Sequence, residues 1–475
     1  MYDAIIIGGG LAGSTLAAHL ARAGRSVLLL EKRRLPADKL CGEFLSPEVT
    51  SSLRTLGVLE EVRSAGAHPI RRARITSAGG ASFESALPGT ALGLSRRRLD
   101  TLLFENARRA GADARDGTKA RAVEGTLGDG FSVKTGAGER FAGRLVFGAY
   151  GRRGVLDRTL ERPFLDEDAP LVAFKAHYQA TRSAEALPDG AIEVHTFPGG
   201  YCGLARIETG AVNACWIART SLLKDAGGTP EAMADEALAQ NPALAERMNA
   251  MKRTSGDFEA TSQVTLQTKG AFAGGGVCMV GDTAGMIAPL CGDGMAMAMR
   301  AAELAVEPAG AFLEGRHSAE AFRSAYERKC APSAGFRRWA AGSSAARAAG
   351  KAVRGCTPRV LARLRSRRGS EGGVPSRCAS KRPKRPSANR RDAARGPVEA
   401  KGHALCGAPQ KAKDDVRGLN VRRPPSVSKR SFADLLKPPF QQKTPQLKGL
   451  GRFGDGRVSV SHRMGYVSRR QVRVE

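Results

Sequence analysis

The sequence predicts an α/β fold in which a helix-covered parallel sheet carries an inserted antiparallel sheet. Two observations support this prediction. The first 31 residues contain a buried strand, a glycine-rich turn, a helix and a second buried strand, and a similar strand and turn return near residue 280. Between these regions, residues 171–218 contain stretches that alternate apolar and polar positions, as antiparallel strands do.

The opening unit is predicted element by element. Residues 2–7 include three consecutive isoleucines and end at glycines, which is typical of a buried parallel strand. Residues 11–23 are rich in Ala and Leu and precede Gly24, as expected of a helix with a glycine just past its end. Residues 26–30 (SVLLL) are predicted to form a second buried strand, which ends at Glu31. Parallel strands joined in this way form a right-handed βαβ unit.

Further elements follow along the chain. Residues 52–68, 96–111 and 230–251 have helical patterns, and residues 117–147 hold short strand-like runs separated by glycines. After residue 277, a buried strand leads through a glycine-rich turn into an Ala/Met-rich helix. We therefore predict a discontinuous nucleotide-binding domain (1–70, 95–160 and 268–330), a substrate-binding sheet domain (71–94 and 161–267) and a basic tail (335–475).

The net charge of +29 is concentrated near the end of the sequence. Residues 351–475 contain 32 Lys and Arg against 8 Asp and Glu, whereas residues 1–350 carry a net charge of only +5. The body therefore has the charge balance of an ordinary globular protein. From about residue 335 the chain is rich in Arg, Pro and Ser, so we expect this tail to be disordered.

Two other interpretations of the tail remain open. An out-of-frame reading of a GC-rich coding region beyond Lys329 would also produce this composition, and resequencing the gene there decides the matter. The run KRPKRP at residues 381–386 would alternatively bind phosphates in a nucleic acid. Because the tail lacks interleaved aromatic residues that stack on bases, no nucleic-acid partner is expected.

The nine cysteines include no CxxC pair and have no histidine at metal-ligand spacing. Reduced thiols and no metal site are therefore expected. The first residues lack a basic signal-peptide region, and no apolar run approaches the roughly 20 residues of a spanning helix. These features predict a cytoplasmic protein without a transmembrane segment.

The turn after the first strand matches GxGxxG in the context that gives this motif its meaning. Gly8 permits the tight turn, Gly10 allows the backbone to approach a pyrophosphate, and Gly13 allows close packing of helix on strand. The helix N-terminus supplies free N–H donors to phosphates. Glu31, 18 positions after Gly13, is placed to accept hydrogen bonds from ribose hydroxyls.

A second glycine-rich segment, GDTAGMIAPLCGDG, occupies residues 281–294. With it, the chain resembles the flavin monooxygenases of the p-hydroxybenzoate hydroxylase type and the geranylgeranyl reductase-like flavoproteins. The resemblance implies an FAD-binding Rossmann-like domain of the glutathione reductase type. It also implies that Asp282 binds the ribityl chain of FAD. The turn from Pro289 to Gly294 would then run beside the flavin, where the next helix N-terminus stabilises negative charge.

Three shorter segments extend the resemblance to about residues 1–310. KLCGE at 39–43 is similar to a turn near the flavin in the reductase-like members, and makes Cys41 a candidate beside the reacting ring. Arg96 matches an arginine that lies beside the cofactor phosphates, and FPGGY at 197–201 is similar to part of the substrate sheet. The predicted cofactor-binding residues are Gly8, Gly10, Leu11, Ala12, Gly13, Glu31, Lys32, Cys41, Gly42, Arg96, Gly281, Asp282, Pro289, Gly292, Gly294 and Met295.

The sequence departs from the hydroxylase pattern at one segment. GAYGRRGVLDR at 148–158 has Tyr150 where the family commonly has an Asp that is linked to both FAD and pyridine nucleotide. Residues 1–335 also lack a second GxGxxG motif for a separate nicotinamide domain. We therefore expect the electron donor to be a transiently bound NAD(P)H or another protein. The related halogenases carry a WxWxIP segment, which is absent here, so halogenation is disfavoured.

The leading hypothesis is an FAD-dependent monooxygenase that hydroxylates an aromatic or polyketide-like small molecule with NAD(P)H and O₂. The alternative is a flavin-dependent reductase that saturates an alkene or prenyl chain, which KLCGE and the missing Asp favour. A third hypothesis is a flavin-binding protein inactivated by a damaged C-terminal region. The sequence names neither the substrate nor the oligomeric state.

Overall fold

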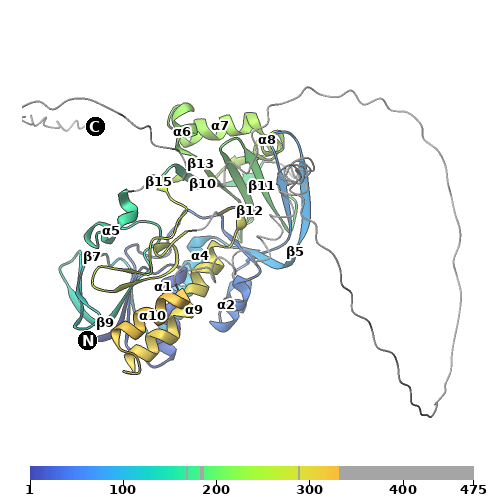
Figure 1. Cartoon of the computed structure of the whole chain (residues 1–475). Coiled ribbons are helices and arrows are strands. Elements are labelled where there is room, and N and C mark those ends of the chain that lie inside the picture. Colours follow the sequence, from blue (N-terminus) through green and yellow to red (C-terminus); the bar gives the residue numbers. More distant parts are fainter. Residues whose placement is uncertain (167–168, 182–186, 287–288, 331–475) are drawn as a thin grey trace, which may run out of the picture. The chain divides into compact units, whose positions relative to one another are not determined.

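The computed structural model describes residues 1–166, 169–181, 187–286 and 289–330. Within this part of the chain, two sheets carry the fold (Figure 1). The tail predicted for residues 335–475 lies outside the described residues.

Sheet A contains the predicted parallel strands. Its order is β16-β17-β9-β1-β2-β6, and β7 and β8 extend β9 as an antiparallel ribbon. The neighbours β6, β2, β1, β9 and β17 run parallel. Its strands are β1 (Tyr2–Ile7), β2 (Val27–Leu30), β6 (Asp113–Arg115), β7 (Ala120–Thr126), β8 (Gly130–Thr135), β9 (Arg140–Gly148), β16 (Phe272–Ala273) and β17 (Val277–Met279).

The strand order of sheet A alone indicates the edge at which a ligand would bind. The chain places β2 and β6 on one side of β1 and β9 on the other, so the strand order reverses beside β1. In open parallel sheets, ligands bind at the carboxyl ends of the strands at this reversal. Both glycine-rich segments begin at this edge, after β1 and after β17.

Helices cover sheet A and complete its core. α1 begins directly after the first glycine turn, and its apolar face is buried with residues of α4, α9 and α10. Ser95 caps α4 by accepting a 3.2 Å hydrogen bond from the Arg98 backbone nitrogen. The helices are α1 (Leu11–Arg22), α2 (Val49–Thr55), α3 (Leu59–Ser64), α4 (Arg96–Arg109), α5 (Val155–Thr159), α9 (Gly294–Leu313) and α10 (Ala319–Cys330), with the 3₁₀ turns η1 (Pro163–Asp166), η2 (Gly281–Thr283) and η3 (Pro289–Cys291).

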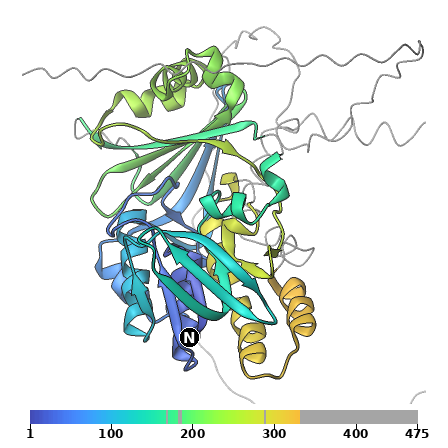
Figure 2. The ribbon, with the colours of Figure 1, turned by 90° about the vertical axis from the view of Figure 1, so that its left-hand side faces the viewer.

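Sheet B has the order β14-β10-β13-β12-β11-β4-β5-β3, with β15 also paired to β10. Helices α6 (Thr220–Asp225), α7 (Pro230–Gln240) and α8 (Pro242–Asn249) cover the face turned away from sheet A (Figure 2). Its strands are β3 (Phe44–Leu45), β4 (His68–Thr76), β5 (Ser82–Gly93), β10 (Leu171–Ala180), β11 (Ala191–Phe197), β12 (Gly200–Arg206), β13 (Val212–Arg219), β14 (Met251–Arg253) and β15 (Glu259–Val264).

Two details of the prediction are corrected. Residues 52–68 do not form one helical region: α2 and α3 are separated at Gly57, which has φ of +67° and ends α2, and β4 begins at His68. Sheet B is not wholly antiparallel, because β11 pairs with β4 in parallel. Between β5 and β11 the chain passes through sheet A. No hairpin therefore connects β4 to β11, and the two strands can pair in parallel.

The chain passes between the two sheets four times, over residues 30–44, 93–113, 148–171 and 264–272. β3 and the first residues of β4, which lie inside the predicted range 1–70, pair within sheet B. The division into a cofactor domain and a substrate domain stays a prediction. In the described part of the chain, every helix is too short or too polar to cross a bilayer.

Candidate functional site

The carboxyl edge of sheet A opens into a cavity of about 990 Å³. The turn after β1, the KLCGE turn, the segment after β9 and the segment after β17 form one side of it, and sheet B forms the other. Of the predicted cofactor-binding residues, all except Gly13 line this cavity. The structure therefore brings together segments that lie more than 250 residues apart in the sequence.

The glycines of the first turn differ in how much space a side chain would have at each position. Gly8 has φ of +117°, and a Cβ on it would lie 2.4 Å from the Ala149 carbonyl oxygen. A Cβ on Gly13 would lie 1.8 Å from the Gly8 carbonyl oxygen, so Gly13 serves close packing of α1 on the turn. A Cβ on Gly10 would meet only the ends of the Arg96 and Lys39 side chains, each at 3.7 Å. Gly10 is thus the position where the turn is open to a ligand.

Glu31 lies at the end of β2 and is 4% exposed. Its carboxylate accepts hydrogen bonds from the Gly9 backbone nitrogen at 2.9 Å and the Arg33 backbone nitrogen at 3.0 Å. These bonds hold the side chain beside the glycine turn, where the predicted ribose contact requires it. Its neighbour Lys32 also lines the cavity, and burial lowers the pKa of the Lys32 ammonium while Glu31 opposes that change.

Arg96 opens α4 and reaches the turn, but its strongest partner is Asp100. The guanidinium donates to both carboxylate oxygens of Asp100, at 2.8 and 2.9 Å, and Lys39 Nζ lies 2.8 Å from Asp100 Oδ2. Burial would lower the pKa of Arg96, but Asp100 keeps it raised. Two cations fixed by one buried carboxylate therefore flank Gly10, which suits a diphosphate.

The KLCGE turn meets the N-terminus of α9. Cys41 Sγ lies 3.9 Å from Met295 Sδ, and both residues line the cavity. A Cβ on Gly294, the first residue of α9, would meet no atom within 4 Å. Gly292 has φ of +72°, which the turn before the helix requires. The open N-terminus of a 20-residue helix is thus presented to the cavity.

Asp282 follows β17 and lines the cavity. Burial raises the pKa of Asp282, and the charges of Lys269 and Arg152 oppose this effect. Lys269 Nζ donates to the backbone oxygens of Arg152 at 2.6 Å and Asp282 at 3.0 Å. Thr283 Oγ1 adds a bond to the Gly151 backbone oxygen at 3.1 Å. These contacts fix the segments after β9 and β17 against each other.

Tyr150, the residue that departs from the hydroxylase pattern, lies in this fixed region. Its hydroxyl donates to Asp157 Oδ1 at 2.8 Å, and burial raises the pKa of the phenol. Asp157 is fully buried and also accepts from the Gly154 backbone nitrogen at 2.7 Å and Arg162 Nη1 at 3.0 Å. The carboxylate near this segment is therefore Asp157, which is satisfied by the protein itself.

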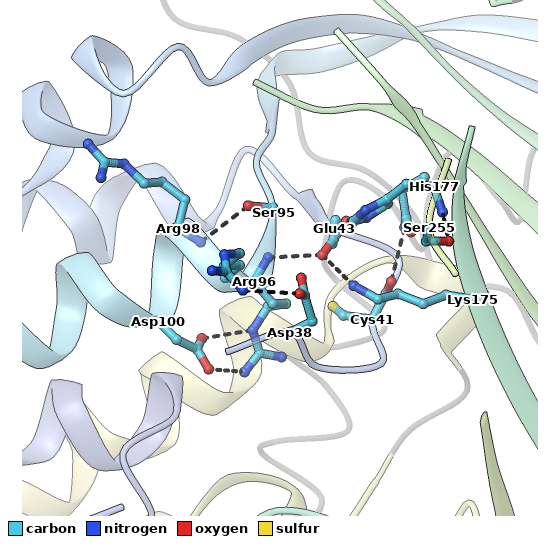
Figure 3. A network of polar contacts seen from close by, with 12 residues as sticks. Asp38, Cys41, Glu43, Ser95, Arg96, Arg98, Asp100, Lys175, His177 and Ser255 are labelled. Carbon is cyan, nitrogen blue, oxygen red and sulfur yellow. Dashed lines mark hydrogen bonds and ion pairs between the residues drawn. The ribbon is translucent and has the colours of Figure 1, made fainter. Parts of the chain in front are cut away.

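Glu43, the last residue of the KLCGE turn, forms the centre of a buried charged cluster (Figure 3). It accepts from Lys175 Nζ at 2.7 Å and from the Arg96 backbone nitrogen at 3.0 Å, and its Oε2 lies 2.7 Å from His177 Nε2. Burial would raise the pKa of Glu43, but the His177 hydrogen bond and the Lys175 charge hold it below its usual value. Lys175 and His177 belong to β10, so this cluster ties the turn to sheet B.

Sheet B supplies the apolar wall of the cavity. Ile192 and Val194 on β11 line it, and the intervening Glu193 and the following His195 do not, as the twofold alternation of a strand requires. Glu193 is instead buried in a network with Arg247 and His195. Tyr201, part of the predicted substrate sheet, also lines the cavity. Other apolar side chains on this wall are Ala73, Ile75, Phe83, Leu87 and Ile217.

The residues fit the cofactor that the sequence implies. Gly10 leaves an open cradle between two cations, and Gly294 leaves a helix N-terminus open. Within the described residues, the Asp282 carboxylate accepts no hydrogen bond, so it is available to hydroxyl donors such as those of a ribityl chain. Over the same residues, no group of three or more His, Cys, Asp or Glu side chains is arranged to hold a metal ion.

The predicted set of site residues lacks Asp100, Lys175, His177 and Lys269. Lys39 and Arg152 were noted only as members of the KLCGE and GAYGRRGVLDR segments. Asp100 had a local signal, because it follows Arg96 by four positions on a helix. Lys175 and His177 had none, since their partner Glu43 is more than 130 residues away in the sequence.

Comparison with known proteins supplies relatives for this chain. The menaquinone reductase of Mycobacterium tuberculosis is 28% identical over 329 residues, covering 64% of this chain and 76% of the relative. The squalene epoxidase of Saccharomyces cerevisiae is 38% identical over 69 residues, which is 14% of each chain.

Solved structures share the fold. The myxobacterial chondrochloren halogenase aligns with a TM-score of 0.59 at 23% identity, over 69% of this chain and 78% of that chain. The halogenase PltM in complex with phloroglucinol and FAD aligns with a TM-score of 0.60 at 18% identity, over 69% of this chain and 73% of that chain. The family model described as FAD binding domain matches residues 1–335. The chain therefore belongs to the FAD binding domain family and is an FAD-dependent oxidoreductase of the p-hydroxybenzoate hydroxylase-like superfamily.

Proposed function

We propose that the chain is a monooxygenase that hydroxylates a largely apolar aromatic or polyketide-like molecule, with O₂ as co-substrate and NAD(P)H as electron donor. One observation carries this proposal: a single cavity is bounded by the dinucleotide-binding turns on one side and by the apolar face of sheet B on the other. Such a cavity holds cofactor and substrate against each other and excludes water. The cytoplasmic location predicted from the cysteines belongs to the same proposal.

In this proposal each wall has a separate task. FAD, when bound, supplies the two-electron chemistry and the activation of O₂. Lys39 and Arg96 hold its diphosphate at Gly10, and Glu31 holds the adenosine ribose. The open N-terminus of α9 stabilises negative charge that develops beside it. The apolar side chains of sheet B orient the substrate, which explains why the cavity needs no catalytic triad.

A reductase that saturates an alkene or prenyl chain is the second candidate. Its support is the relationship to menaquinone reductase, which spans 329 residues, whereas the squalene epoxidase relationship spans 69. The KLCGE turn on the cavity wall and Tyr150 in place of the usual Asp also favour it. Both candidates use the apolar wall to bind the substrate. They differ in whether oxygen or hydrogen is added to it.

Oxygen dependence separates the two candidates. The full chain, loaded with FAD, is supplied with NADPH or NADH and with either 4-nonylphenol or menaquinone-4. Incorporation of ¹⁸O from ¹⁸O₂ into 4-nonylphenol supports the monooxygenase. Hydrogenated menaquinone-4 formed in the strict absence of oxygen supports the reductase. A purified chain that stays colourless and takes up no FAD contradicts both.

A further inference from the structure

Arg152 occupies the meeting point of the two segments that follow β9 and β17. Its backbone is fixed there, because Lys269 Nζ donates to the Arg152 carbonyl oxygen at 2.6 Å. The preceding Gly151 nitrogen donates to Thr283 Oγ1 at 3.0 Å. Arg152 lines the cavity. The side chain therefore starts from a rigid point on the cofactor side of the cavity.

The Arg152 guanidinium differs from the other arginines of this wall. Arg96 is paired with Asp100, and Arg153 Nη1 donates to Gln263 Oε1 at 2.9 Å. Within the described residues, the Arg152 side chain makes no hydrogen bond and no ion pair. Arg152 is half-buried. A guanidinium carries five N–H donors, and those that are shielded from water without an acceptor cost free energy.

The groups around Arg152 define what it faces. Burial lowers the pKa of Arg152, and the strongest opposing charge is that of Asp282. Cys41, Cys215 and Arg96 are its other electrostatic neighbours. Cys215 lies on β13 of sheet B and Cys41 on the KLCGE turn, and both line the cavity. Arg152 is thus directed to the region where the cofactor wall meets the substrate wall.

We propose that Arg152 is the cationic contact for an oxyanion bound inside this cavity. The oxyanion is a diphosphate oxygen of FAD or an acidic group, carboxylate or phenolate, of the substrate. A guanidinium binds either of them with paired, charge-assisted hydrogen bonds. This inference rests on the proposed function, since it assigns a ligand group to the same cavity.

The first experiment compares flavins with and without phosphate. The full-length chain is stripped of flavin, and the affinities for FAD and for riboflavin are measured by fluorescence quenching. In Arg152→Gln, a diphosphate contact predicts FAD binding weakened at least about tenfold and riboflavin binding changed less than about twofold. Arg152→Lys keeps the charge and retains part of the affinity. Arg158→Gln is the matched control, because Arg158 is exposed on α5 and does not line the cavity.

The second experiment compares an acidic and a neutral probe of the same shape. Binding of 4-octylbenzoate and 4-octylbenzyl alcohol is measured by calorimetry, with both the FAD-loaded and the flavin-free chain. A contact with the substrate predicts that the native chain prefers the benzoate, and that Arg152→Gln loses this preference by at least about tenfold.

The two experiments identify the oxyanion or reject the inference. Loss of the FAD preference assigns Arg152 to the diphosphate, and loss of the benzoate preference assigns it to the substrate. If Arg152→Gln keeps both preferences at the values of the native chain and of Arg158→Gln, the inference is wrong. A native chain that binds no flavin contradicts the proposed function instead, and the flavin-free calorimetry still decides the role of Arg152.

Discussion

Lys175 on sheet B donates a 2.7 Å hydrogen bond to Glu43 on the KLCGE turn, and the two side chains are 3% and 0% exposed. Glu43 has φ of +53°, a backbone conformation that non-glycine residues rarely adopt. The buried contacts of its carboxylate with Lys175, His177 and the start of α4 compensate for this conformation (Figure 3). The pair therefore holds the KLCGE turn, with Cys41 and Gly42, on the cavity wall.

Glu43→Gln should destabilise the protein strongly, because Lys175 would be left as a buried cation without its counter-charge. We expect a loss of about 3–5 kcal/mol in the free energy of unfolding. Glu60→Gln is the matched control: Glu60 forms an exposed pair with Arg63, and its loss should cost less than about 1 kcal/mol. Urea unfolding followed by circular dichroism measures both variants. Equal midpoints for the two would show that the buried pair contributes nothing.

Local patterns explain why part of this structure is predictable from sequence. Gly8, Gly10, Gly13 and Glu31 fall within one strand-turn-helix-strand unit, whose geometry depends on neighbouring residues. The elements of sheet A follow for the same reason. The corrected break at Gly57 was hidden, because an apolar helical pattern continues on both sides of it.

Long-range pairing explains what the sequence does not reveal. Glu43 could be noticed in KLCGE, but its partners on β10 are selected only when sheet B packs against the turn. Tyr150 stood out as a departure from a family pattern, whereas its bond to Asp157 depends on how the segment after β9 folds back. Charged side chains of this kind show no periodicity, so only the folded chain identifies their partners.

Gly10→Val should abolish FAD retention without unfolding the chain. Gly10 has φ of −84° and ψ of −167°, which valine adopts readily, and its Cβ would meet only the flexible ends of Arg96 and Lys39. The added side chain would occupy the proposed place of the diphosphate. Visible absorbance of the purified protein measures retained flavin. Gly79→Val, at an exposed turn, should remain yellow, and a yellow Gly10→Val would place the phosphates elsewhere.

The lowered pKa of Lys269 should make the free energy of unfolding depend on pH in mild alkali. Lys269 is 8% exposed, and burial lowers its pKa to about 8 from a usual value of 10.5. Between these values the unfolded chain binds more protons than the folded chain, so the free energy of unfolding should rise with pH through this window. The rise amounts to roughly 3 kcal/mol at full titration.

The difference between the native chain and Lys269→Met isolates this contribution, because other lysines, tyrosines and cysteines also titrate in alkali. In unfolding curves at intervals from pH 7 to pH 11, the stability of the native chain minus that of Lys269→Met should rise as the lysine loses its charge. Parallel stability curves for the two proteins would contradict the lowered pKa of Lys269.

Tyr150→Phe and Tyr150→Asp should differ in their effects. Tyr150→Phe removes one hydrogen bond to the buried Asp157 and should cost about 1–3 kcal/mol. Tyr150→Asp restores the residue type of the hydroxylase pattern but places a second carboxylate beside Asp157, so it should cost more. Thermal unfolding at pH 7 and at pH 5 tests this prediction. At the lower pH the introduced carboxylate is more often protonated, so the difference in melting temperature between Tyr150→Asp and Tyr150→Phe should become smaller. A Tyr150→Asp protein as stable as the native chain would show that Asp157 tolerates a neighbouring charge.

The four passages of the chain between the two sheets have a mechanical consequence. Two bodies joined by one linker can open freely about a hinge, whereas four crossings restrict their relative motion to what all four connections allow at once. We therefore expect the two walls of the cavity to keep nearly the same separation when a ligand binds. The width of the cavity is then expected to set which ligands fit by size.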